Sequence, residues 1–277
     1  MPSRRLAASA AANAGLVGVL VWTLFPIFWL LLMSLKPASE AFAFPPKFIF
    51  APTFDAYYQV LFRQAEGVKW VAYWFNSMKV ATLSTSIALL IGVPAAYGLV
   101  RFPARQRLGL FAILSVRFMP PIVVVIPLLF IMRALKLSDT VLGLSLIHAV
   151  FALPFVVWIM IAFFAAIPRD LGEAALVDGA GEWAALGRVM LPIVRPGLVA
   201  AALFSALLSW NEFPVALVLT GEAAKTIPVA ATTLIAQRTI HWDRVAATGM
   251  IAIVPTVIFA AFLQRHLVRG LSAGAVK

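Results

Sequence analysis

Six stretches of the chain are long and apolar enough to cross a lipid bilayer, and this pattern limits the fold more than any other feature. A hydrocarbon core of about 30 Å needs roughly 20 helical residues at about 1.5 Å each. Strands of a membrane barrel would alternate in polarity every second residue, which these stretches do not. We therefore predict an all-α membrane protein, a single transmembrane domain over 1–277. Its six spans run over about 12–34, 72–100, 109–132, 141–166, 197–219 and 245–264.

Composition supports this fold class and excludes several kinds of site. Hydrophobic residues make up 63% of the chain, against about 45–50% in soluble domains. The net charge of +11 comes from scattered basic residues, so anionic lipid headgroups explain it better than nucleic acid does. The sequence has no cysteine, and no His and carboxylate cluster has metal-ligand spacing. We expect no metal site and no nucleic-acid partner.

A short basic turn sets the expected orientation. Arg101, Arg105 and Arg107 lie between the second and third predicted spans, and the positive-inside rule acts best on such short loops. With six spans, both termini share the side of this turn. We therefore expect both termini in the cytoplasm.

One polar segment, residues 168–192, interrupts the apolar pattern between the fourth and fifth spans. Asp170 with Glu173 three residues later has the pattern of an Asp capping box. Gly179 is expected to bend the chain after this helix, because glycine readily adopts a left-handed conformation. Glu182 can begin a second helix. The sequence thus predicts a helix–bend–helix on the cytoplasmic side, either an interfacial connector or a rigid knob that docks on a soluble partner.

The spacing of this segment resembles the EAA motif of bacterial ABC-importer permeases. That pattern is Glu-Ala-Ala, three residues, Gly, nine residues, Ile, one residue, Leu-Pro, and only Val189 departs from it here, by one methylene. The matching residues are Glu173, Ala174, Ala175, Gly179, Leu191 and Pro192, and Asp178 matches the DGA common in the sugar-uptake branch. The stretches "RFMPPIVVVIPLLF" and "SWNEFPVALVLT" are also similar to carbohydrate-importer permeases, and the resemblance covers essentially the whole chain.

The resemblance implies a role and a set of partners. It implies a bacterial inner-membrane subunit that lines half of a path for a carbohydrate or carbohydrate-like solute. A second homologous permease, two cytoplasmic ATPases and a solute-binding protein would complete the transporter. The ATPases would bind ATP and Mg, because this chain has no phosphate-binding loop, and no cofactor is expected in it. The residues of the motif, Glu173 to Pro192, would be the coupling segment that contacts an ATPase.

Polar residues inside the predicted spans are candidates for the translocation path, since intramembrane charges are costly and often functional. They are Arg117 in the third span and Trp210, Asn211 and Glu212 in the fifth. Structural hydrogen bonds between helices explain them equally well. Arg117 can pair with Glu212 or with an acid on the partner permease. His148 is expected to be a satisfied polar residue and not a ligand.

Two other functions remain open from the sequence. A secondary transporter or channel would work without ATP and would need ion sites in broken helices. A membrane-embedded enzyme would need a nucleophile–base or metal constellation, and the sequence shows none. The external loop 220–244 is a candidate contact for the binding protein. The sequence does not identify the solute.

Overall fold

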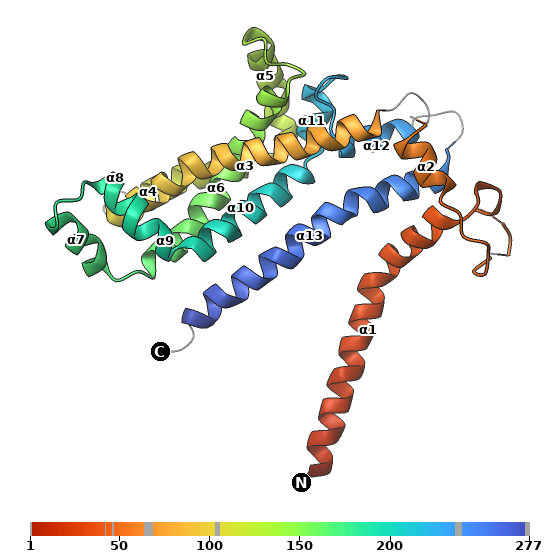
Figure 1. The fold of residues 1–277 in the computed structure, drawn as a ribbon, viewed down its shortest axis with the longest axis horizontal. Helices are drawn as coiled ribbons and strands as arrows, with labels where there is room; N and C mark the ends of the chain where they lie inside the picture. Colours follow the sequence, from red (N-terminus) through yellow and green to blue (C-terminus); the bar gives the residue numbers. More distant parts are fainter. Residues whose placement is uncertain are drawn as a thin grey trace. The chain divides into compact units, whose positions relative to one another are not determined.

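The computed structural model describes residues 2–41, 43–45, 47–63, 69–102, 106–235 and 240–274, all helical or irregular (Figure 1). The chain forms two compact units, one made of 1–70 with 230–254 and the other of 71–229 with 255–277. Four helices are long and apolar enough to cross a membrane unbroken, or six spans if each of two bent helix pairs counts as one. The all-α membrane fold is thereby confirmed.

Four of the predicted spans are continuous helices. Those expected over 72–100 and 141–166 have bounds within two residues of the prediction. The first helix begins ten residues earlier than expected, and the last one ends ten residues later. Aliphatic runs without an internal stop signal explain why they do not break, although each contains one proline that neighbouring protein can accommodate. The helices are α1 (Pro2–Leu35), α3 (Trp70–Arg101), α6 (Val141–Ala165) and α13 (Trp242–Gly274).

In the first unit, α1 is followed by a short turn η1 (Ala38–Glu40) and by α2 (Asp55–Leu61). The Ser34 hydroxyl lies 2.7 Å from the Tyr57 hydroxyl, and the Thr53 amide donates to the Leu35 carbonyl. These bonds fold the segment after α1 back onto its end. Residues 12–29 of α1 are exposed within this chain, as expected of a helix that faces lipid or another subunit.

The third predicted span is not one helix. It consists of α4 (Gln106–Ser115), the turn η4 (Val116–Phe118) and α5 (Pro121–Ala134). The axes on either side of the break differ by 93°, and α5 points away from α4 in Figure 1. Pro120 and Pro121 cause this break, because neither can donate an amide hydrogen and each disfavours helix in the residue before it.

The fifth predicted span is also interrupted, so the expectation of one helix over 197–219 is wrong. It consists of α10 (Arg195–Trp210) and α11 (Pro214–Leu219), with Asn211 closing the first helix. Pro214 at the start of α11 explains the new helix, since proline is well tolerated in a first turn. At its other end, α10 meets the preceding helices at 84°.

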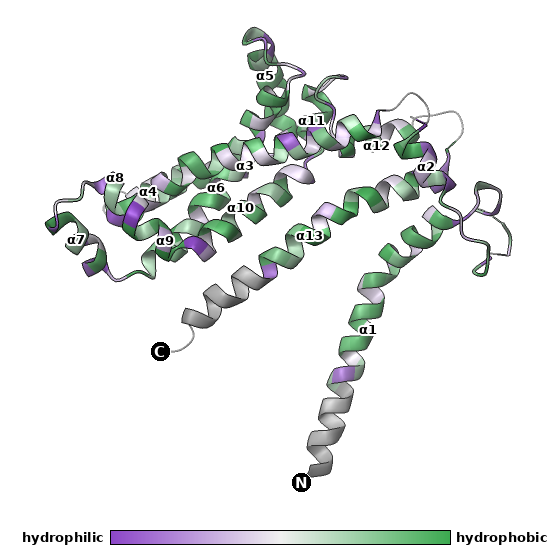
Figure 2. Cartoon of the chain, in the orientation of Figure 1, coloured by the Kyte–Doolittle hydropathy of each residue, from purple (hydrophilic) through white to green (hydrophobic). Residues whose placement is uncertain are grey.

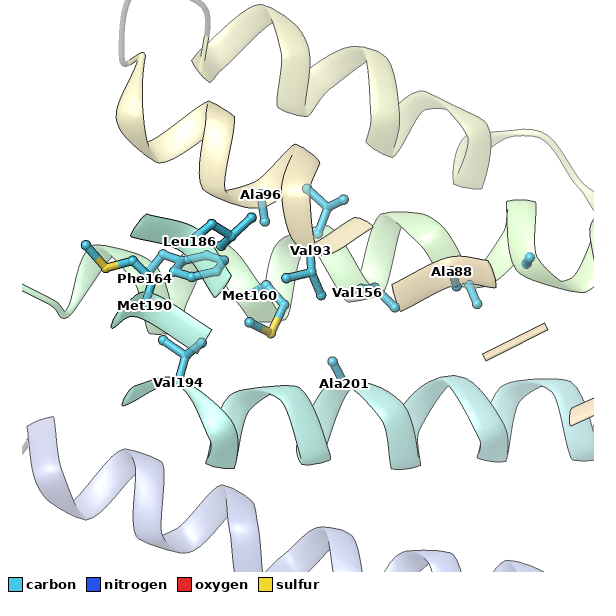
Figure 3. Packing of buried hydrophobic residues seen from close by; sticks show 13 residues of the cluster. Ala88, Val93, Ala96, Val156, Met160, Phe164, Leu186, Met190, Val194 and Ala201 are labelled. Carbon is cyan, nitrogen blue, oxygen red and sulfur yellow. The ribbon is translucent and has the colours of Figure 1, made fainter. Parts of the chain in front are cut away.

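The core of the second unit joins α3, α6 and α10, which lie side by side in Figure 1. Small residues such as Ala88, Ala96 and Ala201 allow close approach, and larger ones such as Val156 and Met160 fill the space (Figure 3). A Cβ added to Gly197 would collide with the Phe163 ring. Figure 2 shows apolar residues dominating these helices, with polar ones gathered near α7 and α8.

A second cluster of buried hydrophobic residues packs α5 against α11. Asp139, in the turn after α5, binds the turn that follows α11. The Asp139 carboxylate accepts hydrogen bonds from the amides of Gly221, Ala223 and Ala224, at 2.7 to 3.1 Å. The Asn76 amide donates to the Ala223 carbonyl at 2.8 Å. The start of the predicted external loop 220–244 is therefore a fixed turn, and the loop also contains an unpredicted helix, α12 (Ile227–Ile235).

Candidate functional site

The predicted coupling segment is a helix–bend–helix, as expected. Helix α7 (Arg169–Val177) ends at Asp178, and Gly179 follows with a φ of +85°. This left-handed conformation is one that glycine adopts without strain. Helix α8 (Glu182–Ala184) begins the second arm, which continues through the π-helical η5 (Ala185–Met190) and α9 (Leu191–Ile193).

The predicted role of Asp170 as N-cap is wrong. The N-cap position of α7 is Pro168, which makes no side-chain capping bond, and Asp170 is the second residue of the helix. Pro168 has an extended backbone that starts the helix too early for an Asp170 cap. The Asp170 carboxylate still lies in the first turn, where the helix dipole favours a negative charge.

The two alanines of the motif point in different directions. Ala174 is exposed, whereas Ala175 is buried. A Cβ on Gly172 would approach the Met190 side chain to 2.8 Å, so α7 packs closely on η5. On the outer surface, Leu171, Val177 and Trp183 expose apolar side chains. An exposed apolar surface of this kind is typical of a protein contact.

The second arm joins this surface to the helix core. Leu191 is partly buried against the core of α3, α6 and α10, and Pro192 is exposed in the first turn of α9. The segment is therefore rigid at its base and exposed at its tip.

Arg101, the last residue of α3, faces acids on both arms of the segment. Its Nη1 lies 3.7 Å from Glu173 Oε1, and its Nε lies 3.3 Å from Glu182 Oε1. The Tyr97 hydroxyl donates to the other Glu182 oxygen at 2.8 Å. The sequence indicated Arg101 only as part of a basic turn, of which residues 103–105 lie outside the described residues.

Replacing Gly179 with Val should loosen the bend, whereas Asn should preserve it. No atom lies within 4 Å of a Cβ placed there, so the cost comes only from the left-handed backbone, about 1–2 kcal/mol for most residues and less for Asn. Amide hydrogen exchange over 174–180 should be roughly tenfold faster with Val, since about 1.4 kcal/mol is a factor of ten. Equal exchange in the Val and Asn variants would contradict this account of the bend.

Glu212 lies at the break between α10 and α11. Its two carboxylate oxygens accept the amides of Val215 and Ala216 at 2.9 and 3.0 Å. Glu212 Oε2 also lies 3.2 Å from Nε2 of His148, which is buried in α6; the contact is within ion-pair distance but does not have the geometry of a hydrogen bond. The carboxylate thus closes the open amino end of α11.

His148 is part of a buried polar chain, which the sequence did not reveal. Its Nδ1 lies 2.8 Å from the Ser209 hydroxyl, which accepts from the Ser84 hydroxyl at 3.0 Å. The chain joins α3, α6 and α10 inside the apolar core. Pro214 was a sequence signal for the start of α11, since proline favours the first position of a helix. Nothing in the sequence indicated that His148 would lie beside Glu212.

The other candidate path residues lie in different surroundings. Trp210 is 2% exposed and packs against Trp74 at 6.1 Å between ring centroids. Asn211 is exposed, and its amide donates to the Leu207 carbonyl. The Arg117 guanidinium lies 4.3 Å from the centre of the Phe155 ring. In the described part of the chain Glu212 is paired with His148 and not with Arg117, so of the two partners predicted for Arg117 only an acid on another subunit remains.

Arg117, His148 and Glu212 nevertheless share a cavity of about 130 Å³, which Phe151 and Leu208 also line. The cavity therefore combines a cation, a carboxylate and an aromatic ring. Among the residues that the structure describes, no group of three or more His, Asp or Glu side chains is placed to hold a metal ion.

Comparisons with known proteins agree with this architecture. Residues 88–273 match the family described as the binding-protein-dependent transport system inner membrane component. The sulfoquinovosyl glycerol transport system permease protein SmoH of Agrobacterium fabrum is 36% identical, covering 94% of this chain and 90% of that protein. The trehalose transport system permease protein SugB of Mycobacterium tuberculosis is 36% identical over the full length of both chains.

A solved structure shares the fold. It belongs to a bacterial ABC transporter involved in the import of the acidic polysaccharide alginate, with a TM-score of 0.72, 24% identity, and coverage of 92% of this chain and 95% of that one. The family match spans the helix–bend–helix of 168–192, the interrupted fifth span and most of α13. The chain therefore belongs to the binding-protein-dependent inner membrane components, the non-catalytic permease subunits of ABC transporters.

Proposed function

We propose that this chain forms half of the translocation path of an ATP-driven importer for a carbohydrate or carbohydrate-like solute. The observation that carries the proposal is the helix–bend–helix of 168–192, whose base is buried on η5 and whose tip is exposed. The names of SmoH and SugB, which refer to sulfoquinovosyl glycerol and trehalose, support the solute class.

The remaining partners follow from the family. A second homologous permease completes the path, two cytoplasmic ATPases bind and hydrolyse ATP with Mg, and a solute-binding protein delivers the solute. Both termini and the coupling segment lie on the cytoplasmic side of the bacterial inner membrane, and the 1–277 chain acts as one transmembrane domain. The turn at Asp139 and Gly221 is near the opposite end of α3 from Arg101, which supports placing it outside.

In this proposal the coupling segment transmits ATPase motion. Glu173 pairs with a basic group of an ATPase, and Ala174 permits close approach. Ala175, Leu191 and the Asp178–Gly179 bend hold the knob in shape, with Pro192 beginning the turn toward α10. ATP-driven closure then displaces the knob and rocks the spans as a rigid body.

The solute path contains Arg117, Asn211 and Glu212, with Trp210 behind them. The shared cavity and the exposed Asn211 support this assignment. Hydroxyl groups of a sugar can bond to the amide and guanidinium, and an aromatic ring such as Phe151 offers its face to the sugar's apolar side.

Co-purification and reconstitution test the function. The chain should be expressed with its neighbouring permease and ATPase genes, purified through a tag on this chain, and placed in liposomes with the binding protein. We expect the ATPase to co-purify and labelled sugar to accumulate only with ATP and binding protein. Uptake by this chain alone, without ATP, would instead establish a secondary transporter or channel.

A further inference from the structure

We propose that Arg101 is a positioning residue that ties the coupling segment to α3 and carries the segment's displacement into that span. The inference rests on the proposed function, because it concerns how the same coupling segment is held against α3. It starts from one geometric fact: a single guanidinium faces carboxylates on both sides of the Gly179 bend.

The Glu182 side of this contact is the firmer one. Glu182 accepts from both Arg101 and Tyr97, so each carboxylate oxygen has a donor. The Tyr97 ring packs edge-on against Phe164 at the end of α6, with centroids 5.6 Å apart. The arm that leads into α10 is therefore bound to the ends of α3 and α6 together.

The Glu173 side is looser. Its distance of 3.7 Å is the longer one, and the Glu173 side chain is 60% exposed against 43% for Glu182. Glu173 is thus able to leave Arg101 when another cation approaches, while Glu182 stays bound. Without the guanidinium, two carboxylates would face each other across the bend and repel.

The ion pairs of Arg101 are weak enough to break and re-form while the chain stays folded. Partly exposed ion pairs change an equilibrium by about fivefold or less each, so the contact at Arg101 does not determine whether the chain folds. The buried core of α3, α6 and α10 does that. Arg101 instead fixes the position of the second arm relative to α3 through Glu182, and a displaced segment moves α3 only while that contact lasts.

The expected phenotype is uncoupling. In liposomes with the complete transporter, Arg101→Met should leave ATPase association and ATP hydrolysis in place, while solute imported per ATP falls by up to about fivefold for each of the two partly exposed ion pairs that are lost. The ratio of solute to ATP for Arg101→Lys should lie between those of wild type and Arg101→Met. Lysine keeps the positive charge but lacks the planar set of donors with which a guanidinium can contact two carboxylates. Arg195→Met is the matched control, an exposed arginine at the start of α10 that should leave the ratio unchanged.

Exchanging the charges of Arg101 and Glu182 tests whether the single variants fail because the contact is lost or because the structure is disrupted. Arg101→Glu combined with Glu182→Arg should restore at least half of the solute-per-ATP ratio, whereas either change alone lowers it. Tyr97→Phe keeps the packing on Phe164 and should lower the ratio only mildly.

The possible results distinguish the role of Arg101 from the proposed importer function. An unchanged ratio in Arg101→Met, or no restoration in the exchanged pair, would overturn the positioning role while leaving the importer proposal intact. Failure of the wild-type chain to co-purify with any ATPase would instead overturn the proposed function itself.

Discussion

Replacing Glu173 with Lys is expected to lower ATP-driven uptake by at least about tenfold without reducing the amount of chain in the membrane. The change removes the acid proposed to meet a cation on the ATPase, and losing one partner of an interfacial charge pair costs about 2–5 kcal/mol. It also places a second cation beside Arg101, now 3.7 Å from the carboxylate. Uptake into liposomes and ATPase co-purification measure the effect.

Two variants sharpen this test. Glu173→Gln keeps the size of the side chain and should reduce uptake less than Lys does, because it adds no repulsion. Asp170→Lys is the matched control, an acid of the same helix that is outside the motif and is not the N-cap. Normal uptake in Glu173→Lys would remove Glu173 from the coupling role.

Replacing Glu212 with Ala should destabilise the chain by about 2–4 kcal/mol, the sum of a lost helix cap and a buried group left without its partner. The carboxylate holds the first amides of α11 and faces His148, whose side chain is 1% exposed. Thermal unfolding of the purified transporter in detergent measures the change.

A double-mutant cycle with His148→Leu identifies the partner. If the two residues stabilise each other, the double variant should be less destabilised than the sum of the two single variants, since residues in contact are not additive. Glu212→Gln should retain part of the cap through its amide oxygen. Full additivity would show that Glu212 acts only on α11 and that His148 does not depend on it.

Hydropathy located the apolar stretches but did not predict whether each forms one continuous helix. It reports how apolar a stretch is, and α5 and α11 consist almost entirely of apolar residues, as α6 does. The breaks lie at Pro120 and Pro214, which were visible in the sequence. Their effect depends on whether neighbours satisfy the freed backbone groups, so proline alone does not distinguish a kink from a new helix.

Part of the candidate site could likewise be predicted from local sequence, and part could not. Local spacing was enough to predict the helix–bend–helix and its Gly179 bend, because caps and turns depend on neighbouring residues. The contacts of Arg101 with Glu182 and of Asp139 with Gly221 join residues 81 and 82 positions apart. Such pairs depend on how α3, α6 and α10 pack, and one sequence carries no local signal for them.

The shortness of α5 has a consequence for biogenesis. Its 14 residues extend about 21 Å, less than the roughly 30 Å of a bilayer core, so it cannot settle across the lipid alone. It packs on α11, and the Asp139 turn that follows it closes on Gly221. The ribosome must therefore add some 80 more residues, about 4–16 s of synthesis, before α5 can reach its final position. Insertion of the third span is completed late, after the fifth has emerged.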